Sequence, residues 1–273
     1  MFNIWQEMFS YSFMVRAIVV GSAVSLCAAL LGVSLVLKRY SMIGDGLSHV
    51  GFGALSIAFA MNLAPLNVAV PVVVIAAFFL LRISQNSKIK GDAAIALISS
   101  TSIAIGVTVT SLTSGLNADI NSYMFGSILA MTPGDVKISV ILSILVFALF
   151  VIFYDRIFAT TFDETFAKAT GVKVELYNML IAFLTAITIV LGMRIMGTML
   201  ISSLIIFPAL TSMRVFNSFK HVIISSGIIS VACFFVGMTV SFLYATPAGA
   251  SVVIVNAIMF IIFSIIGQVI KRH

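Results

Sequence analysis

Charge is scarce in this sequence, and its scarcity excludes a soluble protein. Asp, Glu, Lys and Arg make up 9% of the 273 residues, whereas roughly 25% is usual for soluble domains. Hydrophobic residues make up 61%, and apolar runs of about 20 residues, the length that crosses a bilayer, recur along nearly the whole chain. The composition therefore predicts an all-α polytopic membrane protein. We expect residues 1–273 to form a single transmembrane domain.

Motifs of ATPases and hydrolases are also missing. The chain has no phosphate-binding loop of the form G-x-x-x-x-G-K-S/T, so an ATPase that drives it would be a separate polypeptide. It has no G-x-S-x-G or H-E-x-x-H motif either, which leaves intramembrane hydrolysis without support. The two cysteines, Cys27 and Cys233, lie in apolar spans and are expected to be small buried hydrophobic residues. These absences predict a chain without ATPase or hydrolase activity of its own.

Hydropathy and the polar breaks divide the chain into about nine predicted spans. They cover residues 12–37, 43–62, 66–83, 93–113, 133–154, 177–193, 196–213, 220–243 and 250–270. The weakest division lies at the sequence GMRIMG, residues 192–197, where one bent pass or a re-entrant pair would leave eight spans.

Basic residues orient these spans. With nine spans and a cytoplasmic C-terminus, all of the 15 Lys and Arg residues except Arg16, Lys137 and Arg194 fall on the cytoplasmic side. Such an excess is typical of cytoplasmic loops. The protein is therefore predicted to lie in the cytoplasmic membrane with its N-terminus on the outer side. The net charge of +6 reflects this topology rather than a nucleic-acid partner.

An acid and an imidazole lie together in the second predicted span. Asp45 and His49 are four residues apart, so they share a helical face with Cβ atoms about 6 Å apart. An ionisable residue inside a membrane helix is costly, roughly 2.5 to 3.5 kcal/mol on insertion scales, and therefore marks a candidate functional site. The small residues around the pair are Gly44, Gly46, Gly51 and Gly53. They allow close approach of another helix or of an ion.

The ligand types at this pair suit a metal ion without naming it. One carboxylate and one imidazole are half of the about four ligands that zinc takes, and a two-fold dimer would supply the other half. Imidazole also suits copper, iron and nickel, and carboxylate suits manganese and magnesium. Simpler interpretations are that Asp45 caps its helix or pairs with Arg39, and that His49 only packs. In a further alternative, the pair relays protons in a secondary transporter.

Two other segments carry residues suited to a pathway or gate. Pro208 interrupts an apolar span in which Ser202 offers a hydroxyl to the freed carbonyl groups. A broken helix beside a pathway and a simple proline kink both fit this pattern. The external segment 116–135 contains Tyr123 and Gly126, and it predicts a loop with a partly apolar piece that either gates a path or only packs.

A short amphipathic helix is predicted on the cytoplasmic surface after the fifth span. Thr161 and Glu164 fit a capping box, Phe162 and Phe166 share a face, and Gly171 suits a C-terminal cap. This helix either merely joins two spans or docks a cytoplasmic partner.

Several segments, in order and over nearly the full length, resemble the membrane subunits of bacterial zinc and manganese ABC importers. They are MIGDGLSHVGFG (42–53), NSYMFGSILAMTPGDV (121–136), TFDETFAKATGV (161–172), MGTMLISSLIIFPALTS (196–212) and TPAGASVV (246–253). The resemblance implies a homodimer with the fold of a type II ABC importer permease and a translocation path at the two-fold axis.

The resemblance also implies partners and roles. A cytoplasmic P-loop ATPase would dock on a coupling segment near 160–175, which includes Asp163, and an extracytoplasmic metal-binding protein would deliver the ion. Asp45 and His49 would hold the transported metal, with no cofactor bound permanently. The motifs are nearest those of zinc members, with manganese or iron as the alternative. One departure is Ala245, which stands where some zinc members carry an acid.

Overall fold

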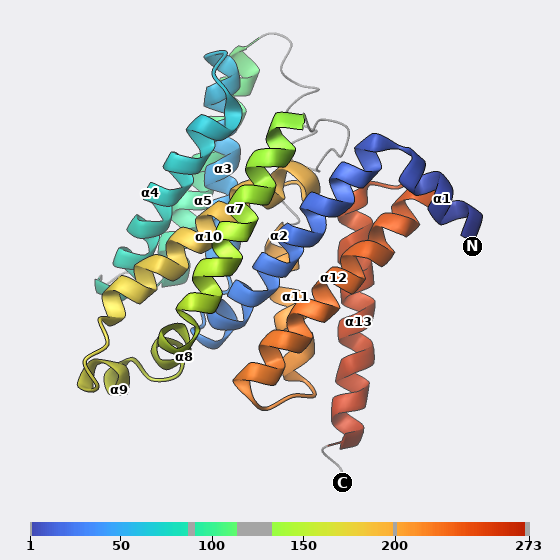
Figure 1. Ribbon diagram of the computed structural model, residues 1–273. Helices are drawn as coiled ribbons and strands as arrows, with labels where there is room; N and C mark the ends of the chain where they lie inside the picture. Colours follow the sequence, from blue (N-terminus) through green and yellow to red (C-terminus); the bar gives the residue numbers. More distant parts are fainter. Residues whose placement is uncertain (1, 87–90, 114–132, 199–200, 271–273) are drawn as a thin grey trace.

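The computed structural model describes residues 2–86, 91–113, 133–198 and 201–270, and all regular structure within these ranges is helical. The helices are α1 (Phe2–Ser10), α2 (Ser12–Leu37), α3 (Ile43–Ala60), α4 (Pro65–Asn86), α5 (Gly91–Leu112), α7 (Pro133–Ile152), α8 (Tyr154–Phe162), α9 (Glu164–Ala169), α10 (Val174–Met196), α11 (Ile201–Met213), α12 (Phe219–Tyr244) and α13 (Ala248–Ile270). The short helices α8 and α9 lie together at one end of the molecule, called here the α8–α9 end (Figure 1).

Among the described residues, eight helices are long and apolar enough to cross a membrane, and α11 is a shorter apolar helix. Both α10 and α12 run away from the α8–α9 end (Figure 1), so α11 between them returns the chain. At 1.5 Å per residue α11 is about 20 Å long, shorter than the hydrocarbon core of about 30 Å. At the division predicted at residues 192–197 the chain therefore changes direction. Helix α10 ends there at Gly197, which has a φ of 85°.

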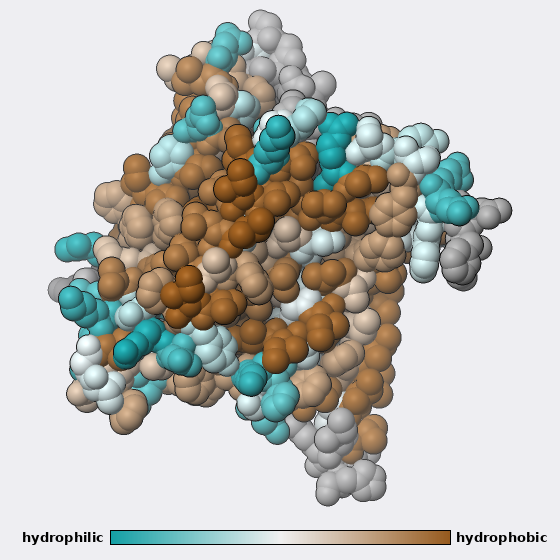
Figure 2. Space-filling view, in the orientation of Figure 1, coloured by the Kyte–Doolittle hydropathy of each residue, from teal (hydrophilic) through white to brown (hydrophobic). Residues whose placement is uncertain are grey.

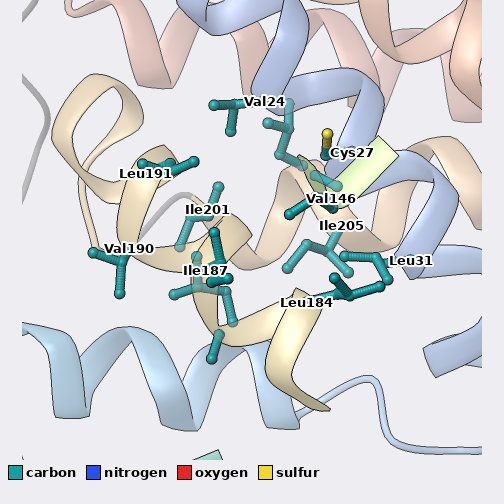
Figure 3. Packing of buried hydrophobic residues seen from close by; sticks show 14 of the residues in the cluster. Val24, Cys27, Leu31, Val146, Leu184, Ile187, Val190, Leu191, Ile201 and Ile205 are labelled. Carbon is teal, nitrogen blue, oxygen red and sulfur yellow. The ribbon is translucent and has the colours of Figure 1, made fainter. Parts of the chain in front are cut away.

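Helix α2 occupies the centre of the bundle. It contacts α7, α10, α11 and α12, and most of its length is buried. Figure 3 shows the packing where α2, α7, α10 and α11 meet. The labelled side chains are Val24, Cys27, Leu31, Val146, Leu184, Ile187, Val190, Leu191, Ile201 and Ile205. Cys27 and Cys233 are both free and buried, which confirms their predicted role as small hydrophobic residues.

The outer surface is apolar across the middle of the molecule. Figure 2 shows hydrophobic residues over this region, with hydrophilic residues gathered toward its two ends. Exposed aliphatic side chains such as Ile141, Ile228 and Ile261 are expected where helices face lipid, because lipid tails solvate them. The structure is therefore that of a multi-span membrane protein, as the composition predicts.

Candidate functional site

The connection between α2 and α3 sets the position of Asp45. Arg39 adopts a φ of 62°, and the backbone N–H groups of Arg39 and Tyr40 donate to carbonyl groups in the last turn of α2. This pair of bonds is a Schellman motif. Helix α3 then starts at Ile43, so Asp45 lies in its first turn, where the helix dipole favours a negative charge.

Asp45 and His49 face each other along α3. Their nearest atoms, Asp45 Oδ2 and His49 Nε2, are 3.6 Å apart. The interpretation of Asp45 as a helix cap is wrong, because Met42 holds the N-cap position of α3 and makes no side-chain cap bond. The ion pair found for Asp45 is with His49 and not with Arg39.

The pair forms a partly exposed stripe, called here the open stripe, on the first part of α3, which is otherwise buried. From Ile43 to Ser56, every residue of α3 except Asp45 and His49 is buried. The side chains of Asp45 and His49 are 34% and 17% exposed. Exposure falls further along the same face, to 4% at Phe52. The stripe therefore opens toward the α8–α9 end and closes at Phe52 within one chain.

Helices α5 and α11 flank this stripe. A Cβ atom at Gly46 would meet Ile95 of α5 at 2.8 Å, and one at Gly44 would meet Ile205 of α11 at 3.2 Å. Helices α4 and α10 contact α3 from the remaining side. The Asp45 and His49 side chains are therefore partly exposed in a gap between the contacts with α5 and α11.

Ser202 of α11 lies beside the Asp45 carboxylate. The sequence places these two residues in separate motifs, and the fold brings them together because α11 packs against the start of α3. Pro208 lies on the same helix, and α11 continues through it from Ile201 to Met213. The interpretation of a helix broken at Pro208 is therefore wrong. Tyr123 and Gly126 lie outside the described residues.

The site in one chain is incomplete for a metal ion. Among the described residues, no group of three or more His, Cys, Asp or Glu side chains could hold a metal. Asp45 and His49 provide one oxygen ligand and one nitrogen ligand, which is half of a typical zinc shell. Since the pair faces an open gap, the missing ligands can come from outside the chain.

The predicted surface helix exists, but its cap differs from the prediction. Helix α8 extends through Thr161 to Phe162, and the Thr161 hydroxyl donates to the carbonyl of Ile157 within α8 (2.6 Å). The N-cap of α9 is Asp163, whose Oδ1 accepts the backbone N–H groups of Thr165 and Phe166 at 2.9 Å each. The capping box at Thr161 is therefore wrong, because α8 continues past it.

The end of α9 and its aromatic residues agree better with the sequence. Gly171 has a φ of 83°, and its N–H donates to Lys168 O while that of Val172 donates to Ala167 O, which is a Schellman motif. Phe166 is 65% exposed. The segment 160–175 thus presents a compact, partly apolar protrusion, called here the knob, at the α8–α9 end.

Lys38 is a site residue that sequence reasoning missed. Its Nζ donates to Glu164 Oε1 at 2.6 Å and to Asn178 Oδ1 at 2.7 Å. Burial raises the pKa of Glu164, but the bonds from Lys38 and Asn178 and the nearby charge of Lys168 outweigh it, so the pKa is lowered overall. The sequence offers only a basic residue at the end of a span, which topology alone explains.

Fold and site together define a polytopic membrane protein with an acid–imidazole pair in its interior and a helical knob at one end. The chain belongs to the ABC 3 transport family, whose model matches residues 10–267. This membership confirms the resemblance found in the sequence motifs.

Relatives and a solved structure agree with this membership. The manganese import system permease protein ScaB of Streptococcus gordonii is 28% identical over 94% of this chain and 92% of its own length. The high-affinity zinc uptake system membrane protein ZnuB of Haemophilus influenzae is 28% identical over 90% of this chain and 94% of its own. The structure of PsaBC from Streptococcus pneumoniae in complex with Fab contains a chain that is similar with a TM-score of 0.86 at 28% identity, over 96% of this chain and 94% of that one.

Proposed function

We propose that this chain is the membrane-spanning permease subunit of an ATP-driven importer of divalent metal ions. The observation that carries the proposal is the Asp45–His49 pair, two potential metal ligands that are partly exposed on a helix long and apolar enough to span a membrane. Similarity to permeases of manganese and zinc uptake systems supports it.

The proposed working unit is a homodimer. Two copies facing each other at the gap between α5 and α11 would bring together two carboxylates and two imidazoles, the about four ligands that zinc takes. Cytoplasmic ATPase subunits would dock on the knob formed by segment 160–175, and an extracytoplasmic binding protein would load the opposite end. The α8–α9 end and the end of α13 are then cytoplasmic, in agreement with the distribution of basic residues.

Zinc is the proposed substrate, and manganese or iron is the alternative. A site of fixed nitrogen and oxygen ligands binds zinc more tightly than manganese or ferrous iron, following the Irving–Williams order. The names of the relatives include both zinc and manganese, so the ion has to be decided by transport.

The test is uptake of radiolabelled zinc and, separately, manganese in cells that lack this chain. Wild type, Asp45→Ala and His49→Ala are compared at equal membrane levels, with His221→Ala and Asp155→Asn as controls on exposed residues at the α8–α9 end. We expect wild type and controls to restore zinc uptake and both site variants to abolish it. Normal uptake by the site variants would refute the role of the pair.

The same cells separate the proposal from a proton-coupled transporter. Collapse of the proton gradient at constant ATP leaves an ATP-driven importer active, whereas it stops proton-coupled uptake. Loss of zinc uptake under that condition would therefore replace the proposed mechanism with the proton relay.

A further inference from the structure

Lys38, at the end of α2, places a charged group in a buried position where it bonds to residues of α9 and α10. Its side chain is 5% exposed. A buried ammonium group costs several kcal/mol unless it is paired and hydrogen-bonded. Here Glu164 of α9 and Asn178 of α10 both accept from it, and the Asn178 amide also donates to the same Glu164 oxygen at 3.0 Å.

One end of this network lies on the knob proposed to dock the ATPase. Glu164 is the first residue of α9. A small apolar cluster also attaches α9 to the start of α10. Its buried members are Ala167, Val172 and Val174. Glu164 is therefore the polar contact through which α9 reaches α2.

The other end of the network leads directly to the metal site. Lys38 is the C-cap of α2, and Tyr40 N–H donates to Leu35 O at 2.8 Å. The N–H of Ile43 donates to Tyr40 O at 3.0 Å, and α3 begins at Ile43. The connection between α2 and α3 is therefore a short, hydrogen-bonded turn. Asp45 follows in the first turn of α3. The backbone from Lys38 to Asp45 is thus a short turn closed by hydrogen bonds.

From this arrangement we propose that Lys38 is the positioning residue that couples movement of α9 to the Asp45–His49 site. The inference rests on the proposed function, since it requires an ATPase on the knob and a metal at the pair. ATPase-driven displacement of α9 pulls Glu164, Glu164 pulls the Lys38 ammonium, and α3 moves with the end of α2. Asn178, which is 3% exposed, keeps the pair in register against α10.

Burial makes Lys38 the informative residue to change. Glu164 is partly exposed, with 43% of its side chain accessible, so a change there could alter docking of the ATPase directly. Lys38 is covered by the chain and cannot touch that partner. An effect of Lys38 on coupling must therefore pass through its two partners, Glu164 and Asn178.

The experiment uses the complex purified from its native membrane through a tag on this chain and reconstituted in proteoliposomes. ATP hydrolysis and import of radiolabelled zinc are both measured, for wild type, Lys38→Met and the double variant Lys38→Met/Glu164→Met. Lys220→Met and Asp155→Asn serve as controls, because both residues are exposed at the α8–α9 end and lie outside segment 160–175. We expect ATP hydrolysis to persist in Lys38→Met while zinc imported per ATP falls about 5- to 150-fold, the usual range for coupling between two sites.

The double variant separates coupling from simple stability. Replacing both partners of an ion pair by apolar groups often restores stability, so its thermal unfolding should return toward wild type while import per ATP stays low. Recovery of import together with stability would show a purely structural pair and overturn the inference, as would a wild-type ratio in Lys38→Met. Wild-type complex that hydrolyses ATP without importing zinc, manganese or iron would instead overturn the proposed function itself.

Discussion

Replacing Gly53 by alanine tests how tightly α3, the helix that carries the site, is held against α5. The added methyl carbon would stand 2.9 Å from the backbone oxygen of Ser102, about 0.5 Å inside ordinary van der Waals contact. Because a helix backbone cannot turn away as a side chain can, the two helices must separate. Overpacking of this kind costs about 1 to 3 kcal/mol, and the better helix propensity of alanine returns about 1 kcal/mol. We expect a net loss of up to about 2 kcal/mol.

Gly227→Ala is the matched control. Its methyl carbon would stand 3.0 Å from Leu26 Cδ1, nearly the same distance, but the neighbour is the end of a flexible side chain. Leu26 and Gly227 also line an apolar groove of about 1060 Å³ between α2, α7 and α12, so Leu26 has room to move. We therefore expect Gly227→Ala to be neutral or to gain up to about 1 kcal/mol from helix propensity.

Thermal unfolding in detergent, followed with a thiol-reactive fluorescent dye, measures both variants. Cys27 and Cys233 are buried and react with the dye when the fold opens. A difference of 1 kcal/mol shifts the Tm of a chain this size by about 2 to 4 °C, so Gly53→Ala should melt several degrees below Gly227→Ala. Equal melting temperatures for Gly53→Ala and Gly227→Ala would show that α3 and α5 can adjust to the added methyl group, contrary to this prediction. Since Gly53 lies one turn beyond His49, zinc uptake should fall with Gly53→Ala as well.

Two further predictions concern the α8–α9 end. Asp163→Ala removes the side-chain cap of α9 and should lower the local stability of α9 by about 0.5 to 2 kcal/mol, as measured by amide hydrogen exchange. Thr161→Ala should leave exchange in α9 unchanged. A larger effect of Thr161→Ala would instead support a capping box at Thr161. The pKa of Glu164 lies below its ordinary value because Lys38, Asn178 and Lys168 outweigh the effect of burial. The ionised Glu164 therefore stabilises the fold fully above its unfolded pKa of about 4.3. This stabilisation is lost as the pH falls through the lower pKa of the folded state. Melting temperatures measured from about pH 3 to 7 should then fall more steeply at the acid end for wild type than for Glu164→Gln, and parallel curves would contradict this.

Hydropathy predicts the spans well where a charged break bounds them. The span predicted at residues 12–37 matches α2 (Ser12–Leu37), because Lys38 and Arg39 end the apolar run. The span predicted at 177–193 ends too early, because α10 continues to Met196 and is capped by Gly197. Hydropathy locates apolar length, and backbone geometry such as the φ of Gly197 decides where a helix ends.

Local motifs fail where tertiary packing chooses between two registers. The pattern from Thr161 to Glu164 satisfies a capping rule, yet α8 continues to Phe162, whose ring lies 5.7 Å from that of Phe219 on α12. The contact favours one more turn of α8 and moves the cap to Asp163. Lys38 and Glu164 are 126 residues apart in the sequence, so no spacing rule relates them. By contrast, the Asp45–His49 pair is predictable because helix periodicity alone places it on one face.

The open stripe on α3 also constrains the transport cycle. If two copies hold an ion through both Asp45–His49 pairs, zinc has about four ligands, and structural sites of that kind bind with apparent energies of about 10 to 16 kcal/mol. An ion held so tightly would not leave, although transport requires release as well as binding. The inward-facing state must therefore separate the ligands of the two copies. Because Asp45 is joined to Lys38 by a closed turn, moving the ends of α2 apart is sufficient to do this. An inward-open structure with metal held by all four ligands at zinc distances would contradict this cycle.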